Sequence, residues 1–382
     1  MSKLNELIHK LCPDGVEYKK IKDVFQRLRG TPITAGKMKE IESSDGDIRV
    51  FAGGKTVINA KEEDIPNANI IRVPAVLVQS RGVIDVVYYE KPFTFKNEMW
   101  AYTSDNKIAV KFLYYVLKNN IQKFRDAAAG MGSLPQISLP VTEEFEVPVP
   151  PLPVQSEIVR ILDNFTELTA ELTAELTAEL TARKKQYGYY RDFLYTADDA
   201  DVEWTTLDRI SENCDRQRKP VTKGNRVSGK YPYYGASGIV DYVEDYIFDG
   251  DFLLVSEDGA NLLARSTPIA FSISGKNWVN NHAHVLKFDT YELRRYVEIY
   301  LNSIDLSKYI SGGAQPKLNQ ENLNKIPIPV PSPERVKYMV SILDRFDTLC
   351  HDISEGLPAE IEARQKQYEF YCDKLLTFKK LP

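Results

Sequence analysis

The chain repeats itself, and this internal duplication constrains its fold more than any other feature. Residues 135–165 align without a gap on residues 316–346, at a constant offset of 181 residues. The same offset aligns residues 182–196 with residues 363–377, where nine of fifteen positions are identical. The segments that precede these blocks match only in patches. We therefore expect a pseudo-two-fold chain in which one scaffold, present twice, carries two globular domains with different surfaces.

Composition restricts the class of protein. The 382 residues are 43% hydrophobic and carry a net charge of −5, which argues against a general affinity for polyanions. The sequence has no run of about 18 apolar residues, as a membrane-spanning helix would need. It also begins without the apolar stretch and cleavage site of a signal peptide. Its four cysteines form no Cys-x-x-Cys pair, so we expect free thiols in a cytoplasmic protein.

Proline clusters and helical patterns suggest four segments. Consecutive prolines near residues 148–153 and 327–333 end a globular segment in each half, because proline continues neither a helix nor a ladder. We expect the first domain at residues 1–150, a central helix at 151–196, the second domain at 197–331 and a C-terminal helix at 332–382. Both domains are expected to be mixed α/β, which makes the fold class α+β.

The central helix carries a tandem repeat. Thr-Ala-Glu-Leu occurs three times in residues 169–180, and leucine recurs every fourth residue. Each step turns about 40° beyond a full helical turn, so these leucines form an inclined ridge suited to a partner helix. We predict a helical spacer with its ridge at Leu168, Leu172, Leu176 and Leu180.

The C-terminal segment matches this helix but contains an interruption. A second helical pattern runs over residues 333–378, with Gly356 and Pro358 placed to kink or break it. Two long helices in one chain cover their apolar stripes by packing on each other, and an antiparallel, coiled-coil-like arrangement is the simplest one.

Shorter patterns predict elements inside the domains. Residues 70–89 are rich in β-branched side chains around a turn at 80–82, which favours two strands. Residues 110–128 have helical apolar spacing. In the second domain, strands are expected at 251–256 and 267–272.

Catalytic signatures appear only in outline. Residues 224–230 have the spacing of a phosphate-binding loop, but Tyr231 stands where Ser or Thr would hold magnesium. His282 and His284 lie two apart on an expected strand without a Cys or a third His nearby, so hydrogen bonding is favoured over metal binding. No Asn-Pro-Pro-aromatic motif for methyl transfer to a base is present. We expect no catalytic, cofactor or metal site in this chain.

A local concentration of positive charge contrasts with the acidic whole. Six basic residues and no acidic one lie between Arg216 and Lys230. Tyr231, Tyr233 and Tyr234 follow directly, and such rings pack on sugars or bases. A basic run is usually only a solvated face, but these aromatic neighbours favour contact with nucleic acid.

The repeated blocks resemble a known family. The Ile-Leu-Asp-x-Phe motif after each proline cluster, the Thr-Ala-Glu-Leu array and residues 355–378 closely resemble the specificity subunit of type I restriction–modification enzymes. The match is nearest to the subfamily with such central repeats. The resemblance implies two target recognition domains, each reading one half of an asymmetric bipartite site in double-stranded DNA. It also implies two modification (methyltransferase) subunits and two restriction subunits as partners, which would hold S-adenosylmethionine, ATP and magnesium.

With that resemblance, clusters of basic, amide and aromatic residues become candidates for DNA contact. In the first domain the candidates are Lys37, Lys39, Lys55, Gln79, Arg81, Lys96 and Asn97. In the second they are Arg216, Arg218, Lys219, Lys223, Arg226, Lys230, Tyr233, Tyr234, Ser237, Asn280, Asn281 and His282.

Two other classes of protein remain open at this point. A coiled-coil scaffold without nucleic-acid binding would also use long helices, and the divergence of the two domains argues against it. A self-sufficient nuclease or ATPase would need one of the broken motifs to function.

Overall fold

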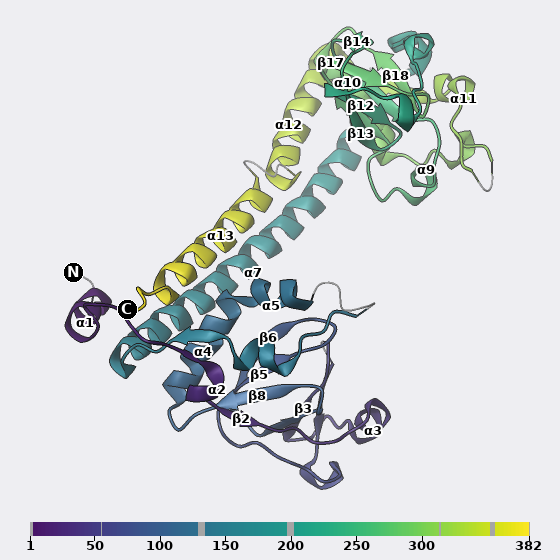
Figure 1. Ribbon diagram of the computed structural model, residues 1–382. Coiled ribbons are helices and arrows are strands. Elements are labelled where there is room, and N and C mark those ends of the chain that lie inside the picture. The colour runs from purple at the N-terminus through teal and green to yellow at the C-terminus, as the bar shows by residue number, and fades with distance from the viewer. Residues whose placement is uncertain are drawn as a thin grey trace. The chain divides into compact units, whose positions relative to one another are not determined.

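The computed structural model describes residues 3–54, 56–128, 134–196, 202–312, 315–351 and 356–381. The chain divides into two compact units, and Figure 1 labels the elements of both. The first unit comprises residues 1–176 and 360–382, and the second comprises residues 177–359. The C-terminal residues therefore return to the unit that contains the N-terminus.

The first unit contains two sheets and a strand pair. A four-stranded antiparallel sheet has the order β2-β8-β5-β6, a three-stranded sheet has the order β4-β3-β7, and β1 pairs with β9. The strands are β1 (Tyr18–Lys20), β2 (Gln26–Leu28), β3 (Ile48–Phe51), β4 (Val57–Ala60), β5 (Ala75–Gln79), β6 (Asp85–Tyr89), β7 (Phe93–Phe95), β8 (Trp100–Thr103) and β9 (Glu146–Pro148). The helices are α1 (Lys3–Leu11), α2 (Ile21–Val24), α3 (Ala35–Ile41), α4 (Lys107–Asn119), α5 (Ile121–Ala128) and α6 (Leu139–Glu143).

The second unit is built in the same way. Its sheets have the orders β11-β18-β15-β16 and β13-β12-β17-β14, and β10 pairs with β19. The strands are β10 (Glu203–Thr206), β11 (Glu212–Asn213), β12 (Ser228–Gly235), β13 (Gly238–Val243), β14 (Phe248–Asp249), β15 (Phe252–Ser256), β16 (Ala270–Ile273), β17 (Lys276–Val279), β18 (Ala283–Lys287) and β19 (Pro327–Val330). The helical elements are α8 (Leu207–Ile210), η2 (Asp215–Gln217), η3 (Lys223–Asn225), α9 (Asn261–Ala264), α10 (Tyr291–Ser303), η4 (Ser307–Tyr309), α11 (Gln320–Asn324) and α12 (Pro333–His351).

The duplication thus extends into the domains whose sequences diverge. Strand order β2-β8-β5-β6 corresponds to β11-β18-β15-β16, and the parallel pair β3–β7 corresponds to the parallel pair β12–β17. In each unit one helix contacts both a sheet and a long helix. Helix α4 of the first unit packs on β5 and β6 and is linked to α7, and α10 of the second unit packs on β16 and α12. Val110 and Leu117 of α4 are fully buried, as are Val297 and Leu301 of α10. Burial of these apolar faces stabilises each domain separately.

The central helix α7 (Leu152–Thr196) is continuous over 45 residues, as predicted. The C-terminal segment is divided into α12 and α13 (Leu357–Leu376), which confirms the break expected at Gly356 and Pro358. In the first unit Phe165 stacks on Tyr371, and Thr166 hydrogen-bonds Tyr368, so α7 and α13 run antiparallel.

The predicted leucine ridge is present, but its exposure is uneven. Leu172, Leu176 and Leu180 are partly buried, whereas 62% of Leu168 is exposed. A four-residue repeat rotates its leucines by about 40° per step, so the row cannot remain on one buried face. The residues 110–128 likewise form two helices instead of one, because Asn120 ends α4. None of the helices in the described ranges is long and apolar enough to cross a membrane.

Candidate functional site

Four turns of the second unit meet at the end of the β11-β18-β15-β16 sheet where β15 ends and β18 begins, and we call them the second turn cluster. They are residues 235–238, 257–260, 280–282 and 315–317. The hydroxyl of Ser256 donates to the carbonyl of Ala236 (2.5 Å), and the amide of Glu257 donates to the carbonyl of His282 (2.9 Å). The amide of Leu318 donates in turn to the carbonyl of Glu257 (2.8 Å). These bonds hold segments that lie far apart in the sequence against one another.

The first unit gathers the equivalent turns into a first turn cluster, made of residues 52–54, 80–83, 96–98 and 134–137. The amide of Ile137 donates to the carbonyl of Ser80 (2.9 Å), as Leu318 does to Glu257. The Ser80 hydroxyl also donates to the carbonyl of Glu98. Gly82 and its counterpart Gly259 adopt positive φ values of 79° and 108°, a conformation that favours glycine. Both domains therefore build the same loop platform from different side chains.

The structure brings together six exposed or half-exposed candidates in these clusters. They are Arg81, Lys96 and Asn97 in the first, and Ser237, Asn281 and His282 in the second. Lys96 is paired with Glu98 at 2.9 Å. The other candidates fall elsewhere: Lys37 and Lys39 lie on α3, and Lys55 lies outside the described residues. A polar surface on loops held by a rigid sheet is a common setting for recognition.

Three candidates are buried and serve the fold in this structure. Tyr233 is fully buried, and Gln79 and Asn280 are each 6% exposed. The hydroxyl of Tyr233 accepts a hydrogen bond from the amide of Val221 (2.9 Å), and the Asn280 side chain accepts one from the amide of His282 (2.8 Å). A direct contact of these side chains with DNA is not supported, since all three are enclosed within their domains. The sequence missed this because tyrosine and amides are common both in cores and at interfaces.

The basic segment from η2 to β12 is partly exposed and partly structural. The guanidinium of Arg226 lies 4.3 Å from the ring centre of Tyr233 and 3.1 Å from the carboxylate of Asp241. Arg218 is largely enclosed, with 13% of its side chain exposed. The exposed members of the run are Arg216, Lys219, Lys223 and Lys230. The side chains of these four residues reach solvent, whereas Arg218 and Arg226 form ion pairs within the domain. Tyr234 is half-buried and lies beside Phe271.

A further basic and aromatic group was not found from the sequence. Lys276 lies 4.5 Å from the ring centre of Tyr246, which packs edge-on against Tyr231. Lys230 lies 5.2 Å from the Tyr231 ring. The phenol of Tyr246 raises the pKa of Lys276 and so favours its charged form. Lys276 is 46 positions from Lys230, so no local sequence pattern connects them.

A buried ionic network supports the second turn cluster. His284 is 1% exposed; its Nδ1 lies 2.6 Å from Asp215 and its Nε2 lies 2.8 Å from the carbonyl of Leu318. The guanidinium of Arg218 lies 2.7 Å from Glu257 and 3.3 Å from Asp215. Burial opposes the charge on Asp215, yet the hydrogen bond from His284 holds the pKa of this carboxyl below its usual range.

The ionic network contains three residues of the kinds that bind metal ions, and their contacts show whether they are available to do so. Ligand atoms of Asp215, Glu257 and His284 all lie within 4.8 Å of one another. The carboxylate of Glu257 accepts hydrogen bonds from both Lys317 (3.1 Å) and Arg218. Because cations of the chain already satisfy these carboxylates, the group behaves as an ion-pair network. His282 does not join it, since its imidazole is exposed and pairs with Asp258.

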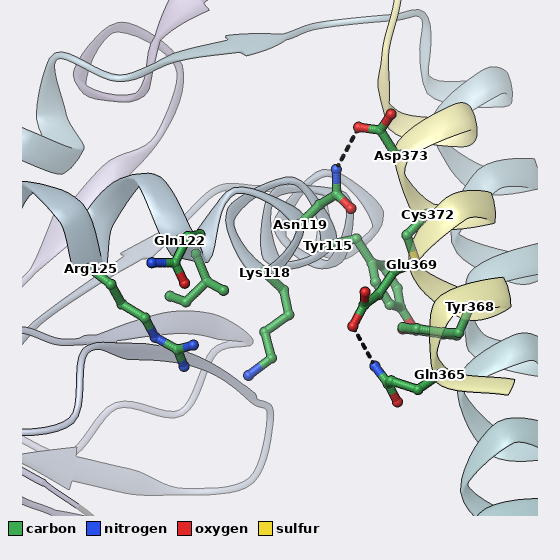
Figure 2. Close-up of a pocket in the computed structure, with 11 residues that line it drawn as sticks. Tyr115, Lys118, Asn119, Gln122, Arg125, Gln365, Tyr368, Glu369, Cys372 and Asp373 are labelled. Carbon is green, nitrogen blue, oxygen red and sulfur yellow. Dashed lines mark hydrogen bonds between the residues drawn. The ribbon is translucent and has the colours of Figure 1, made fainter. Parts of the chain in front are cut away.

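The first unit also contains a groove between its domain and α13 (Figure 2). The groove has a volume of about 580 Å³. Its walls carry basic side chains from α4 and α5, including Lys118 and Arg125, and acidic ones from α13, including Glu369 and Asp373. Asn119 donates to Asp373 across it (3.4 Å). This hydrogen bond links α4 to α13.

Both halves of the chain match the same family of known proteins. The profile described as type I restriction modification DNA specificity domain matches residues 13–182 and again residues 201–363. The chain is 35% identical over 301 residues to the EcoR124I/EcoR124II specificity subunit of Escherichia coli, covering 72% of each chain. It is 37% identical over 181 residues to a putative type I specificity subunit of Haemophilus influenzae, covering 46% of each, so this match spans about half of that relative.

Solved structures show the same fold at low sequence identity. The S subunit of the type I restriction–modification system of M. genitalium superposes with a TM-score of 0.54 and 18% identity, covering 95% of this chain and 96% of that one. A chain from a structure concerned with complex assembly and conformational transition of a type I system gives a TM-score of 0.61 at 13% identity, covering 96% and 98%.

Proposed function

The chain belongs to the family of type I restriction–modification DNA specificity subunits, and from this premise we propose that it recognises an asymmetric, bipartite DNA site. Each domain reads one half of the site through its turn cluster. The observation that carries this proposal is that two platforms built from equivalent turns present different side chains. Arg81, Lys96 and Asn97 stand on one, and Ser237, Asn281 and His282 stand on the other.

The contacts to DNA divide by chemistry. Phosphate contacts supply affinity and position, and contacts to base edges supply sequence preference. We assign the exposed lysines and arginine of the basic segment, together with Lys276, to the phosphates. The side chains of the turn clusters, held on rigid β-sheets, are assigned to base edges in the groove.

The chain recruits its catalytic partners and performs no catalysis itself in this proposal. Two modification subunits and two restriction subunits bind it, and these hold S-adenosylmethionine, ATP and magnesium. Two exposed aromatic side chains at equivalent positions support the proposal that one kind of partner subunit binds at two places. Tyr189 of α7 is 65% exposed, and its counterpart 181 residues later, Phe370 of α13, is 62% exposed. Exposed aromatic residues are frequent anchors of protein interfaces.

A domain exchange tests the proposal. Residues 197–330, which contain the second domain through the end of β19, are replaced by the same domain of another family member. The assembled methyltransferase is then expressed in cells, and methylated positions in the DNA are mapped by sequencing. We expect one half of the methylated site to change while the other half stays the same.

Other results would point elsewhere. If both halves change, or neither does, the domains do not read the halves independently. If the assembled complex binds duplex DNA without any sequence preference, the chain acts as a coiled-coil scaffold and the proposed recognition is wrong. A shift of labelled duplex by the complex, measured over a range of salt concentrations, separates these two cases.

A further inference from the structure

An exposed histidine in the second turn cluster is held by a carboxylate. Nδ1 of His282 lies 2.8 Å from Oδ2 and 3.0 Å from Oδ1 of Asp258, with the two side chains 50% and 34% exposed. The backbone fixes the histidine on both sides. Its amide donates to Oδ1 of Asn280 (2.8 Å), and its carbonyl accepts from the amide of Glu257 (2.9 Å). The imidazole is therefore positioned before any ligand arrives.

Backbone contacts hold Asp258 in place, and its carboxylate faces the imidazole of His282. Its backbone forms a bridge with Lys317, next to the bond between the amide of Gly259 and the carbonyl of Pro316 (3.1 Å). Within the described part of the chain, no lysine or arginine side chain pairs with Asp258. The nearby cations Arg218 and Lys317 are both bound to Glu257. The Asp258 carboxylate thus has the imidazole of His282 as its partner.

This geometry selects one tautomer of the neutral ring. An ionised carboxylate only accepts hydrogen bonds, so the proton of a neutral imidazole must sit on Nδ1. Nε2 is then left with a lone pair and no proton. Among the described residues, none bonds to this nitrogen. With its ring neutral, His282 therefore presents a fixed hydrogen-bond acceptor on the loop platform of the second domain.

Resting on the proposed function, we infer that His282 reads a base whose exocyclic amino group donates to Nε2, with Asp258 as its positioning residue. In the major groove only adenine N6 and cytosine N4 offer such a donor, whereas guanine and thymine present acceptors at the corresponding place. His282 therefore selects adenine or cytosine at one position of the half-site that the second domain reads.

The first domain provides an internal comparison. Glu98 occupies the place of His282 in the alignment of Asn97-Glu98 with Asn281-His282. Glu98 is paired with Lys96 at 2.9 Å, so this platform presents an ion pair in place of an imidazole. Different chemistry at one equivalent position is what two different half-sites require.

The tautomer is tested on the protein alone. The chain has four histidines, so ¹⁵N-histidine labelling of the full-length protein gives few signals, and His282→Gln assigns the relevant one. Above the pH at which the ring loses its second proton, we expect the nitrogen shifts of an Nδ1–H imidazole. In Asp258→Asn, the amide can donate as well as accept, so a mixture of tautomers is expected. A dominant Nε2–H form in the wild type would overturn the inference.

Base selection is tested on the complex assembled with its modification subunits. The probes are duplex oligonucleotides carrying the methylated sequence mapped for the wild type, with each base pair of both half-sites replaced in turn. For His282→Gln and His282→Ala we expect discrimination at one position of one half-site to fall about tenfold, the size of one hydrogen bond. Asp258→Asn should relax the same position to admit guanine or thymine, and Asp258→Glu should largely retain the original preference.

The outcomes separate this inference from the proposed function. The half-site read by the first domain is the control and should be unchanged in every variant. If the variants weaken all sequences equally and lower the log–log salt slope by about one, His282 contacts a phosphate and the base assignment is wrong. If the wild type discriminates between sequences and the variants retain its full pattern, His282 is not a reader. If the wild type shows no sequence preference, the proposed function itself has failed.

Discussion

The ring of Phe165 stacks on the ring of Tyr371, with their centroids 5.4 Å apart and their planes inclined by 26°. In the second unit Tyr190 and Phe346 stack in the same way, 5.6 Å apart at 30°. The two pairs are related by the offset of 181 residues, since Phe165 corresponds to Phe346 and Tyr190 corresponds to Tyr371. Helix α7 therefore contributes the phenylalanine to the first pair and the tyrosine to the second. The joint between α7 and the C-terminal helices is therefore built twice, once in each unit.

These stacked pairs should stabilise their own units independently. We expect double-mutant cycles of Phe165→Ala with Tyr371→Ala to give a coupling free energy of about 0.5–1.5 kcal/mol, as aromatic pairs do. Tyr190→Ala with Phe346→Ala should give a similar value. Equilibrium urea unfolding measures both. A cross-cycle of Phe165→Ala with Phe346→Ala serves as the control and should be additive.

The exposed aromatic residues Tyr189 and Phe370 should each contribute to the binding of one partner subunit. Loss of a buried interface aromatic typically costs about 2 kcal/mol or more, so each alanine variant should weaken one binding event at least about tenfold. Native mass spectrometry of a titration with modification subunit should show complexes with one copy instead of two. Tyr338→Ala is the matched control, because Tyr338 is 60% exposed but its counterpart by the same offset is Glu157. Unchanged stoichiometry in both variants would remove these residues from the interface.

The ionic network around His284 should make the second domain sensitive to acid. Burial opposes ionisation of Asp215 and Glu257, but hydrogen bonds from His284 and Arg218 respectively lower the pKa of each carboxyl. Carboxyls with a lowered pKa stabilise the fold above their unfolded pKa, and this stabilisation disappears as the pH falls through the folded pKa. The window therefore lies below about pH 4.

Thermal unfolding between pH 7 and pH 3 measures this dependence. Asp215→Asn should reduce the free energy of unfolding at pH 7 by about 3 kcal/mol, since it removes the carboxylate that pairs with the buried His284. Its stability should then fall less steeply with acid than that of the wild type. Asp245→Asn, an exposed substitution in the same domain, should change neither value. Equal acid sensitivity of wild type and Asp215→Asn would contradict the assignment.

The sequence predicted the scaffold well because its signals are local. The continuous α7, the break at Gly356 and Pro358, and the strands on either side of residues 80–82 all follow from periodicity or from proline and glycine. The turn clusters do not, because they depend on bonds between distant segments. Ser80 and Ile137 are 57 positions apart, and no propensity links them.

The candidate site was predicted in part for the same reason. Composition identified the basic segment and the amides near residues 280–282, but it could not distinguish an exposed tyrosine from Tyr233, which lies in the core. The pairing of His284 with Asp215 joins residues 69 positions apart, and that of His282 with Asp258 joins residues 24 apart. The pairing of β11 with β18 brings Asp215 beside His284, and the register of β15 with β18 brings Asp258 beside His282.

The exposed lysines of the basic segment should act through phosphates. Replacement of Lys219, Lys223 and Lys230 by alanine should weaken binding of all duplexes alike and reduce the log–log salt slope by up to about 2.7, or about 0.9 per phosphate contact. The half-site preference should stay unchanged. A triple variant of Lys287, Lys325 and Lys337 removes the same charge from other exposed positions of the second unit. If both triple variants alter the slope equally, the basic segment has no special role.

The Thr-Ala-Glu-Leu array should set the number of unspecified base pairs between the half-sites. Deletion of residues 173–176 removes one repeat, which is about 6 Å of rise and about 40° of rotation in an α-helix. On B-DNA one base pair advances about 3.4 Å and turns about 35°. Translation alone would suggest a gap shorter by nearly two base pairs, and rotation suggests one. Rotation should dominate, because a domain that faces the wrong side of the duplex loses its groove, whereas bending absorbs a small axial error.

The side opposite α7 consists of two separate helices, α12 and α13, so a shortened α7 is not opposed by one continuous partner helix. We therefore expect the deletion to preserve both half-sites and to shorten the gap by about one base pair. Methylation mapping of the assembled complex measures the gap. A substitution of the same four residues by alanine keeps the helix length and is the control, for which the gap should not change. An active deletion variant with the original gap would show that the array is not the ruler.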